Sequence, residues 1–153
     1  MKDYEIAAEK DVGELFELQL RAFESEAEMI GSRNIPALME SCEHSREDFK
    51  NWTVLLRRDG SGRIIGAVRF RKTDGHVEIG RLMVAPEHRN RGIAIGLMRA
   101  VERVAQENVF ELYTCTRSDI NIRLYEKLGY RTFREEQGEH ELSFAYMRKT
   151  VRR

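Results

Sequence analysis

Residues 78–108 read EIGRLMVAPEHRNRGIAIGLMRAVERVAQEN, and this stretch decides how the rest of the chain is arranged. Its first part is a short apolar run that stops at Pro86, because proline has no N–H to donate to a neighbouring strand. From Ile93 onward, apolar residues recur every three or four positions, which is typical of one face of a helix. The stretch therefore predicts a buried strand followed by a long helix over residues 91–108.

Gly92, Ala94 and Gly96 place a small residue at every second position where this helix begins. The first turn of a helix has N–H groups without partners in the helix and carries the positive end of its dipole, so it attracts anionic oxygens. Small side chains would let a diphosphate approach the backbone. The same residues could instead let the helix pack closely on a sheet, and taken alone they favour this packing interpretation somewhat.

The composition indicates one domain that binds neither nucleic acid nor a membrane. The chain has 153 residues without a repeat or linker, so residues 1–153 are expected to form a single domain. Its 26 basic and 26 acidic residues balance, which gives no general attraction to nucleic acid or anionic lipid. Cys42, Cys115, His76 and His88 lack the spacing of a disulfide framework or metal site, so no metal is expected. The sequence contains no signal core or transmembrane stretch, and the expected location is the cytoplasm.

The remaining segments predict an α/β (α+β) fold with a mixed sheet of six to seven strands and about four helices. Expected strands cover residues 4–8, 52–57, 64–72, 76–84, 110–115, 130–134 and 142–149. Helices are expected after the capping residues Asp11, Ser45 and Ser118 and from about Arg91, with a helical turn at 35–39. The strands before the long helix are antiparallel, whereas the strands on either side of it form a parallel pair. The carboxyl ends of this pair meet at the start of the helix, where ligands bind in open α/β sheets.

Two motifs coincide in order and spacing. The first is Val84-Ala85-Pro86 followed by Arg89-x-x-Gly92-x-Ala94, and the second is Leu124-Tyr125-Glu126-Lys127-Leu128-Gly129-Tyr130. Together with the order of elements, they resemble the GCN5-related N-acetyltransferase (GNAT) superfamily over almost the whole chain. The resemblance implies a parallel strand pair that splays at a cofactor cleft, acetyl-CoA as the co-substrate, and direct acetyl transfer to a primary amine of a small molecule or peptide. Dimers are common among similar proteins, so the resemblance leaves a homodimer as one option for the oligomeric state.

The resemblance assigns the cofactor site. Backbone amides at the helix start would hold the CoA diphosphate, and the strand before it would pair with the pantetheine arm and offer an amide near Leu82 to the thioester oxygen. Expected cofactor-binding residues are Leu82, Met83, Val84, Arg89, Asn90, Arg91, Gly92, Ile93, Ala94, Ile95, Gly96 and Asn121. Many family members carry an asparagine seven residues before the tyrosine. Here that position is Ser118, so Asn121 either contacts CoA or only helps to cap the helix.

Tyr125 and Glu78 are the expected catalytic residues. Tyr125 matches the tyrosine that the family places near the sulfur, where its hydroxyl could protonate the departing thiolate. The alternative is an aromatic side chain on the buried face of a short helix. Glu78 occupies the position at which related histone acetyltransferases carry a glutamate, and it could accept the proton of the amine. The alternative is a solvated glutamate paired with Arg69, Arg71 or Arg81.

Other readings of the sequence stay open beside this one. The chain could be a non-catalytic acyl-CoA-binding or sensing module, whereas a P-loop-like nucleotide site is disfavoured because no Lys-Ser/Thr follows the glycines. Cys115 could take the acetyl group covalently or be a small buried hydrophobe. Acidic residues between positions 24 and 48 hint at a cationic acceptor, although such runs are usually solvated faces.

Overall fold

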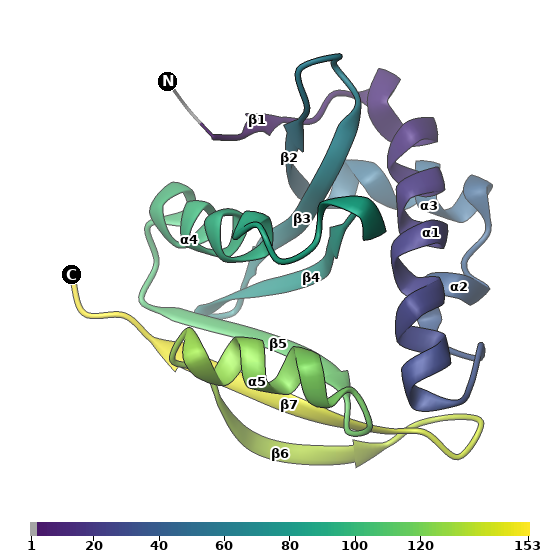
Figure 1. Cartoon of the computed structure of the whole chain (residues 1–153). Coiled ribbons are helices and arrows are strands. Elements are labelled where there is room, and N and C mark those ends of the chain that lie inside the picture. Colours follow the sequence, from purple (N-terminus) through teal and green to yellow (C-terminus); the bar gives the residue numbers. More distant parts are fainter. Residues whose placement is uncertain (1–2) are drawn as a thin grey trace.

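A seven-stranded mixed sheet runs through the computed structural model, which describes residues 3–153 (Figure 1). Residues 1–2 of the predicted domain lie outside this description. The strands are β1 (Glu5–Ile6), β2 (Thr53–Arg58), β3 (Ile64–Thr73), β4 (His76–Val84), β5 (Val109–Cys115), β6 (Arg131–Gln137) and β7 (Ser143–Thr150). Their spatial order is β1-β2-β3-β4-β5-β7-β6, and only β4 and β5 pair in parallel among these described strands. The α/β fold with antiparallel strands before one parallel pair is therefore confirmed.

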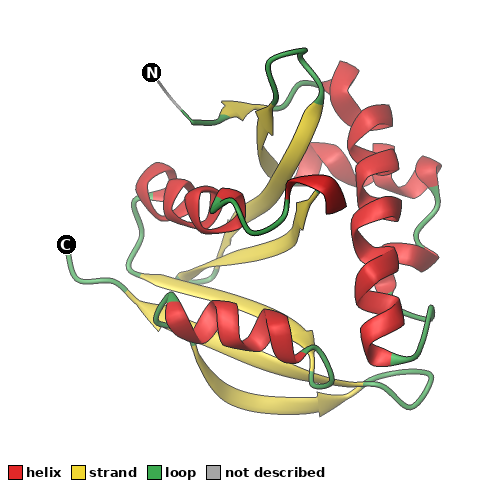
Figure 2. Ribbon diagram, in the orientation of Figure 1, coloured by secondary structure: helices red, strands yellow, loops and turns green. Residues whose placement is uncertain are grey.

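The described chain contains five α-helices, one more than the four or so expected. They are α1 (Val12–Ile30), α2 (Pro36–Met39), α3 (Cys42–Asp48), α4 (Ile93–Ala105) and α5 (Asp119–Lys127). Both α4 and α5 lie on the side of the sheet that faces the reader in Figure 2. No helix within residues 3–153 has the length and apolar character needed to cross a bilayer.

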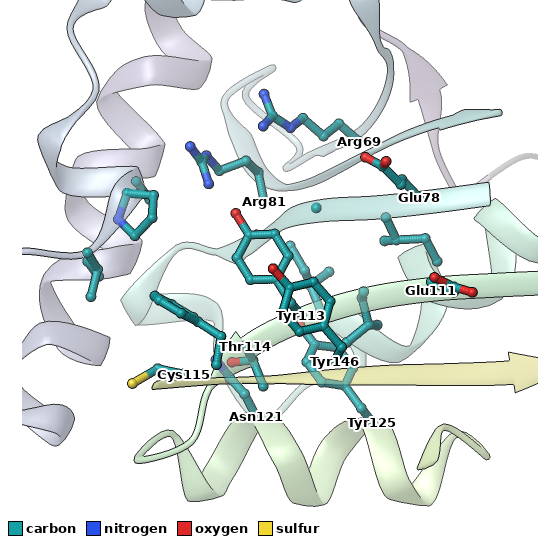
Figure 3. A pocket seen from close by; sticks show the side chains of 18 of the residues that line it. Arg69, Glu78, Arg81, Glu111, Tyr113, Thr114, Cys115, Asn121, Tyr125 and Tyr146 are labelled. Atoms are coloured by element: carbon teal, nitrogen blue, oxygen red, sulfur yellow. The ribbon is translucent and has the colours of Figure 1, made fainter. Parts of the chain in front are cut away.

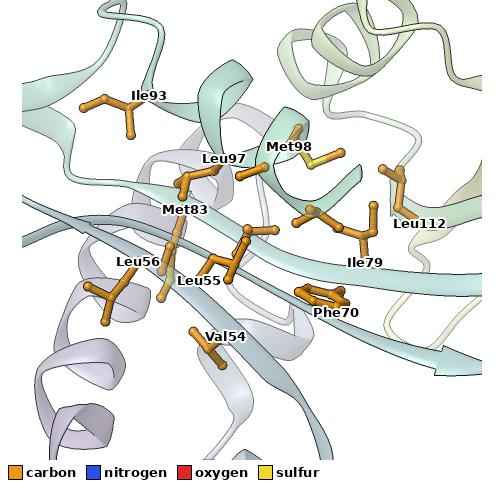
Figure 4. Packing of buried hydrophobic residues seen from close by; sticks show 14 of the residues in the cluster. Val54, Leu55, Leu56, Phe70, Ile79, Met83, Ile93, Leu97, Met98 and Leu112 are labelled. Atoms are coloured by element: carbon orange, nitrogen blue, oxygen red, sulfur yellow. The ribbon is translucent and has the colours of Figure 1, made fainter. Parts of the chain in front are cut away.

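The core lies between α4 and the strands behind it. Leu97, Met98 and Val101 of α4 are buried, and the polar side of the helix faces solvent as its periodicity predicts. Figure 4 shows Leu97 and Met98 on the face of α4 that is turned toward the strands. Helix and sheet approach each other closely at Gly66 of β3, where an added Cβ would lie 2.7 Å from Cγ2 of Ile93. A glycine in the sheet, and not in the helix, thus brings the two layers together.

Strands β4 and β5 diverge immediately after they pair. Their parallel register holds only Val77 opposite Phe110 and Glu78 opposite Glu111, and Figure 1 shows the strands separating beyond this point. On its other side β4 carries a bulge, because Ala67 pairs with Met83 while Arg69 pairs with Gly80. The splayed pair that the resemblance implied is therefore present, with an irregularity of β4 at its opening.

Several helix boundaries differ from the sequence-based expectation. Helix α3 begins at Cys42, where the Ser41 hydroxyl accepts a hydrogen bond from the His44 N–H at 3.0 Å, so the cap predicted at Ser45 was wrong. Helix α4 ends at Ala105 instead of residue 108, because Gln106 adopts a left-handed conformation with φ of 51°. The Asp11 side chain does not cap α1, since it accepts a hydrogen bond from the N–H of Ala8 at 2.8 Å.

Candidate active site

A groove of about 500 Å³ lies between the end of β4, the start of α4, and helices α1 and α5. We call it the α4 groove, and its lining residues include ten of the twelve expected cofactor-binding residues: Leu82, Met83, Val84, Arg89, Asn90, Gly92, Ile93, Ala94, Ile95 and Asn121. Arg91 and Gly96 do not line it. The strand and the helix start thus meet at one cavity, as the order of their sequence motifs predicts.

The backbone at the start of α4 is open. Gly92 has φ of 78°, a left-handed conformation that glycine adopts without steric cost, and a Cβ added there would meet no atom within 4 Å. A Cβ added to Gly96 would also meet nothing. Close packing on the sheet therefore does not explain these two glycines, and the bare first turn of a helix is suited to bind anionic oxygens.

The two arginines next to this turn differ in position. Arg89 donates a hydrogen bond from Nη2 to the Ala22 carbonyl of α1 at 3.0 Å and lines the α4 groove. Arg91 is exposed, and its Nη1 lies 3.2 Å from Nδ1 of His88. Both positive charges thus lie close to the start of α4, but only the Arg89 side chain forms part of the groove wall.

A second cavity of about 630 Å³ occupies the opening between β4 and β5, and we call it the β4–β5 cavity. Its walls include Tyr125, Glu78 and Cys115 (Figure 3). Four residues line both cavities, namely Phe23, Glu26, Leu82 and Asn121. The two cavities therefore share a wall, and the expected catalytic residues lie in the second one.

Tyr125 of α5 is almost fully buried, and its ring packs edge-on against Tyr130 with ring centroids 6.2 Å apart. Burial, and secondarily the negative charge of Glu26, hold the pKa of Tyr125 well above its ordinary value. Its hydroxyl therefore stays protonated at neutral pH. Tyr125 is thus a buried aromatic side chain that also lines the β4–β5 cavity, and its catalytic role stays a prediction.

Glu78 of β4 forms an ion pair with Arg71 of β3. Its Oε2 accepts hydrogen bonds from Nε and Nη2 of Arg71 at 3.2 and 3.1 Å, and its side chain is 39% exposed. Of the three arginines considered as partners, the structure thus selects Arg71. Glu78 also lines the β4–β5 cavity, so the ion pair and a position in the cavity coexist.

Glu26 of α1 is a site residue that the sequence analysis missed. Its Oε1 accepts hydrogen bonds from Ser118 Oγ at 2.9 Å and from Asn121 Nδ2 at 2.7 Å, and neither bond uses Oε2. Burial raises the pKa of Glu26, although these hydrogen bonds and the charge of Arg81 oppose the rise. The sequence contains a pattern that could have identified Glu26, because it lies four residues from both Ala22 and Ile30 on the buried face of α1.

Ser118 and Asn121 lie together at the start of α5 and both contact Glu26. Ser118 is fully buried and makes no capping hydrogen bond, so its predicted role as a side-chain cap was wrong. Asn121 lines both cavities and holds Glu26. The two residues at the start of α5 thus fix a carboxylate that comes from α1.

Two arginines in the β4–β5 cavity were also missed as site residues. The side chains of Arg69 and Arg81 are 17% and 15% exposed, and both line the cavity. The guanidinium groups of Arg69 and Arg71 lie over the Trp52 ring, at 4.0 and 4.1 Å from its centroid. One wall of the cavity is therefore strongly basic.

Glu40, His44 and Asp48 bring possible metal-ligand atoms within 4.8 Å of one another. Glu40, however, lies 3.7 Å from Nη2 of Arg81, and Asp48 accepts a hydrogen bond from Arg69 at 3.2 Å. These carboxylates act as partners of the two arginines, so the cluster does not offer free ligands.

Comparison with known proteins is consistent with this geometry. The model of the acetyltransferase (GNAT) family matches residues 12–130. Two proteins of Bacillus subtilis (strain 168) are similar in sequence. An uncharacterized N-acetyltransferase, YjcF, is 27% identical over 71% of this chain and 74% of its own length. The UPF0157 protein YqkA is 25% identical over 77% of this chain, which spans only 34% of that protein.

Solved structures share the fold. The PaiA N-acetyltransferase from Thermoplasma acidophilum, solved in complex with coenzyme A, has a TM-score of 0.72 and 17% identity, with 97% of this chain and 99% of that chain covered.

Proposed function

The chain belongs to the acetyltransferase (GNAT) family, and from this premise we propose that it transfers the acetyl group of acetyl-CoA to a primary amine. The observation that carries the proposal is the shared wall of the two cavities. The α4 groove offers a helix start suited to a diphosphate, and the β4–β5 cavity holds side chains suited to proton transfer. A ligand that spans both would bring its reactive end to Leu82 and Asn121.

The proposed cofactor site is the start of α4 together with the end of β4. The left-handed Gly92 and the empty space where its Cβ would lie fit the close approach of a diphosphate to the backbone. Arg89 and Arg91 would add positive charge. The pantetheine arm would follow Leu82, Met83 and Val84, since β4 has no strand partner beyond Glu78 on the β5 side within the described residues.

The proposed oxyanion donor is the backbone N–H near Leu82. When bound, acetyl-CoA supplies a thioester whose carbonyl carbon the amine attacks. Leu82 lies in the bulge of β4 and lines both cavities, which supports a position beside this carbonyl. A fixed N–H there would stabilise the negative charge that develops on the carbonyl oxygen.

The proposed acid is Tyr125. Its hydroxyl is protonated at neutral pH, as that of any ordinary tyrosine is, so it has a proton to donate to the sulfur as the C–S bond breaks. Burial and the charge of Glu26 raise its pKa, which makes complete transfer of the proton harder and a hydrogen bond to the developing thiolate the main contribution. A charged tyrosinate would be costly in this buried position, and the proton would have to return from the amine or from solvent after each turnover.

Two carboxylates are candidates for the base that accepts the amine proton. Glu78, expected from the sequence, has Oε1 free of the Arg71 hydrogen bonds, whereas its Oε2 is occupied by Arg71. Glu26 lines both cavities, has a raised pKa, and leaves Oε2 outside its two hydrogen bonds. Glu26 is therefore the better-placed base, and Glu78 is the second candidate.

The experiment that tests the proposed function is release of free CoA thiol from acetyl-CoA with a panel of amines. The panel should contain polyamines, amino acids, aminoglycosides, peptide N-termini and lysine peptides. We expect acceptor-dependent release with at least one class. Tight acetyl-CoA binding without release across the whole panel would instead favour a sensing module.

A further inference from the structure

We propose that the acceptor amine carries a carboxylate, and that Arg69 and Arg81 bind this carboxylate in the β4–β5 cavity. The inference rests on the acetyltransferase activity proposed above and names the class of its acceptor. Its premise is a pair of guanidinium groups that share one wall of the cavity, beside Tyr113, as Figure 3 shows.

The backbone directs both arginines to this wall. Arg69 of β3 pairs with Gly80, and a Cβ at Gly80 would lie 3.5 Å from Nε of Arg69, so the arginine side chain lies across the glycine. Arg81 follows Gly80 in the bulge of β4 and has φ of 48°, which is rare for a residue other than glycine. A non-glycine residue held in this conformation is a frequent mark of a functional position.

The two guanidinium groups have more donors than partners. Each carries five N–H donors in a planar fork that matches a carboxylate. Within residues 3–153, the Nε atoms of both arginines are buried and have no hydrogen-bond partner. Arg69 donates from Nη1 to Asp48 at 3.2 Å, whereas the nearest carboxylate oxygen to Arg81 is that of Glu40, at 3.7 Å. The pair is thus bonded incompletely by the chain itself.

The electrostatics of the pair favour an anion. Burial first, and repulsion from Arg81 second, lower the pKa of Arg69 to about 10, so Arg69 still carries its charge at neutral pH. Two buried like charges raise the energy of the folded chain, and an anionic group placed between them would relieve this repulsion. The geometry and the charge therefore point to the same ligand chemistry.

The neighbouring acidic groups do not replace that ligand. Glu40 does not line the cavity, and its Oε1 already accepts a hydrogen bond from Gln19 at 2.8 Å. Asp48 also accepts hydrogen bonds from Asn51 and Trp52, each at 3.1 Å. The acidic run that hinted at a cationic acceptor is thus partly used by contacts within the chain.

The proposed base lies close to the proposed carboxylate site. Arg81 is near enough to Glu26 to lower the pKa of that carboxyl group against the effect of burial. An acceptor held by Arg81 and deprotonated by Glu26 would therefore have its carboxylate and its amine only a few bonds apart. Free α-amino acids have this arrangement, whereas polyamines lack the anionic group.

The test compares acceptors in matched pairs, each an α-amino acid and its carboxamide, by kcat/KM for thiol release. We expect the wild-type protein to prefer the carboxylate by about ten- to a hundredfold, the effect of a charge-assisted hydrogen bond. Arg69→Gln and Arg81→Gln should remove this preference while activity on the carboxamide is retained, which also shows that the variants fold. Arg81→Lys should restore part of the preference. Arg99→Gln, on the exposed face of α4, should keep the wild-type ratio.

The outcomes separate this inference from the proposed function. The inference would be overturned if the wild-type protein used the carboxamides as well as or better than the amino acids. It would also be overturned if the arginine variants lost kcat/KM equally on both members of a pair. Either result would leave the proposed acetyltransferase activity intact. If neither the amino acids nor the carboxamides, nor any other amine of the panel, caused release of thiol, the proposed function would be overturned. In that case the amino acids are titrated calorimetrically into the protein saturated with CoA. Binding to the wild-type protein that is lost in Arg81→Gln would support the carboxylate site, whereas no binding to the wild-type protein, or equal binding to Arg81→Gln, would refute it.

Discussion

Gly66→Ala should destabilise the protein, because β3 and α4 are packed closely at Gly66. The added methyl carbon would lie 2.7 Å from Cγ2 of Ile93 and 3.2 Å from Cδ1 of Leu97. Ordinary carbon contacts are about 3.5–4.0 Å, so the first distance is about 1 Å too short. Ile93 cannot turn away easily, since a β-branched side chain in a helix has one strongly preferred rotamer.

The expected size of the effect follows from two opposing contributions. Overpacking a core costs about 1–3 kcal/mol, whereas replacing glycine reduces the entropy of the unfolded chain by about 0.4–1 kcal/mol. The difference between these ranges is about 0–2.6 kcal/mol. Because the overlap is about 1 Å with a rigid side chain, we expect a loss in the upper half of that range, about 1.3–2.6 kcal/mol, which lowers Tm by about 3–10 °C in a domain of this size.

Gly96→Ala is the matched control, because a Cβ there would meet no atom within 4 Å. It replaces glycine inside a helix, so it should stabilise the protein by about 0.4–1 kcal/mol and raise Tm by about 1–4 °C. Calorimetric or circular-dichroism melting of both variants measures the two shifts. An unchanged or raised Tm in Gly66→Ala, or an equal loss in Gly96→Ala, would refute the claim that α4 packs through Gly66.

The other predictions concern the site. Tyr125→Phe should lower kcat by about 10²–10⁴-fold with little change in the Kd of acetyl-CoA, and an unchanged kcat would remove it from the mechanism. Glu26→Gln should lower kcat/KM and shift the rise of rate with pH to the pH at which the free amine loses its proton. Glu78→Gln should keep the wild-type pH profile. The reverse pattern would assign the base to Glu78. Because the pKa of Glu26 is raised in the folded protein, the folded state binds more protons than the unfolded state above pH 4.5. The stability of the fold therefore falls as pH rises through the raised pKa, and Glu26→Gln, which removes this charge, should not lower Tm at pH 7. Gly92→Ala should cost about 1–2 kcal/mol through its left-handed backbone and also weaken acetyl-CoA binding, and unchanged affinity would count against the diphosphate site.

Local patterns predicted most of the fold. Pro86, the apolar periodicity from Ile93 and the turn at Gly129 each act within a few residues, so they mark the end of β4, the face of α4 and the end of α5 from sequence alone. Boundaries that depend on a single backbone conformation, such as the left-handed Gln106, were missed. The composition of a segment does not determine which of its residues will leave the helical conformation.

Contacts between distant segments explain what the sequence did not predict in the site. Glu26 and Ser118 are 92 positions apart, and their hydrogen bond depends on how α1 and α5 sit on the sheet. The basic wall depends on the bulge of β4, which places Arg81 beside Arg69 through a shift of register. By contrast, the groove at the start of α4 could be predicted, because β4 and α4 are joined by a short connection within one motif.

Calorimetric titration of the purified protein with acetyl-CoA and with S-acetylpantetheine, which lacks the diphosphate, tests the central claim most directly. The account predicts strong binding of acetyl-CoA, much weaker binding of S-acetylpantetheine, and loss of the difference when Gly92 and Ala94 are replaced by leucine. No heat with acetyl-CoA, or equal affinity for the two compounds in the wild-type protein, would contradict the claim that the start of α4 binds the diphosphate.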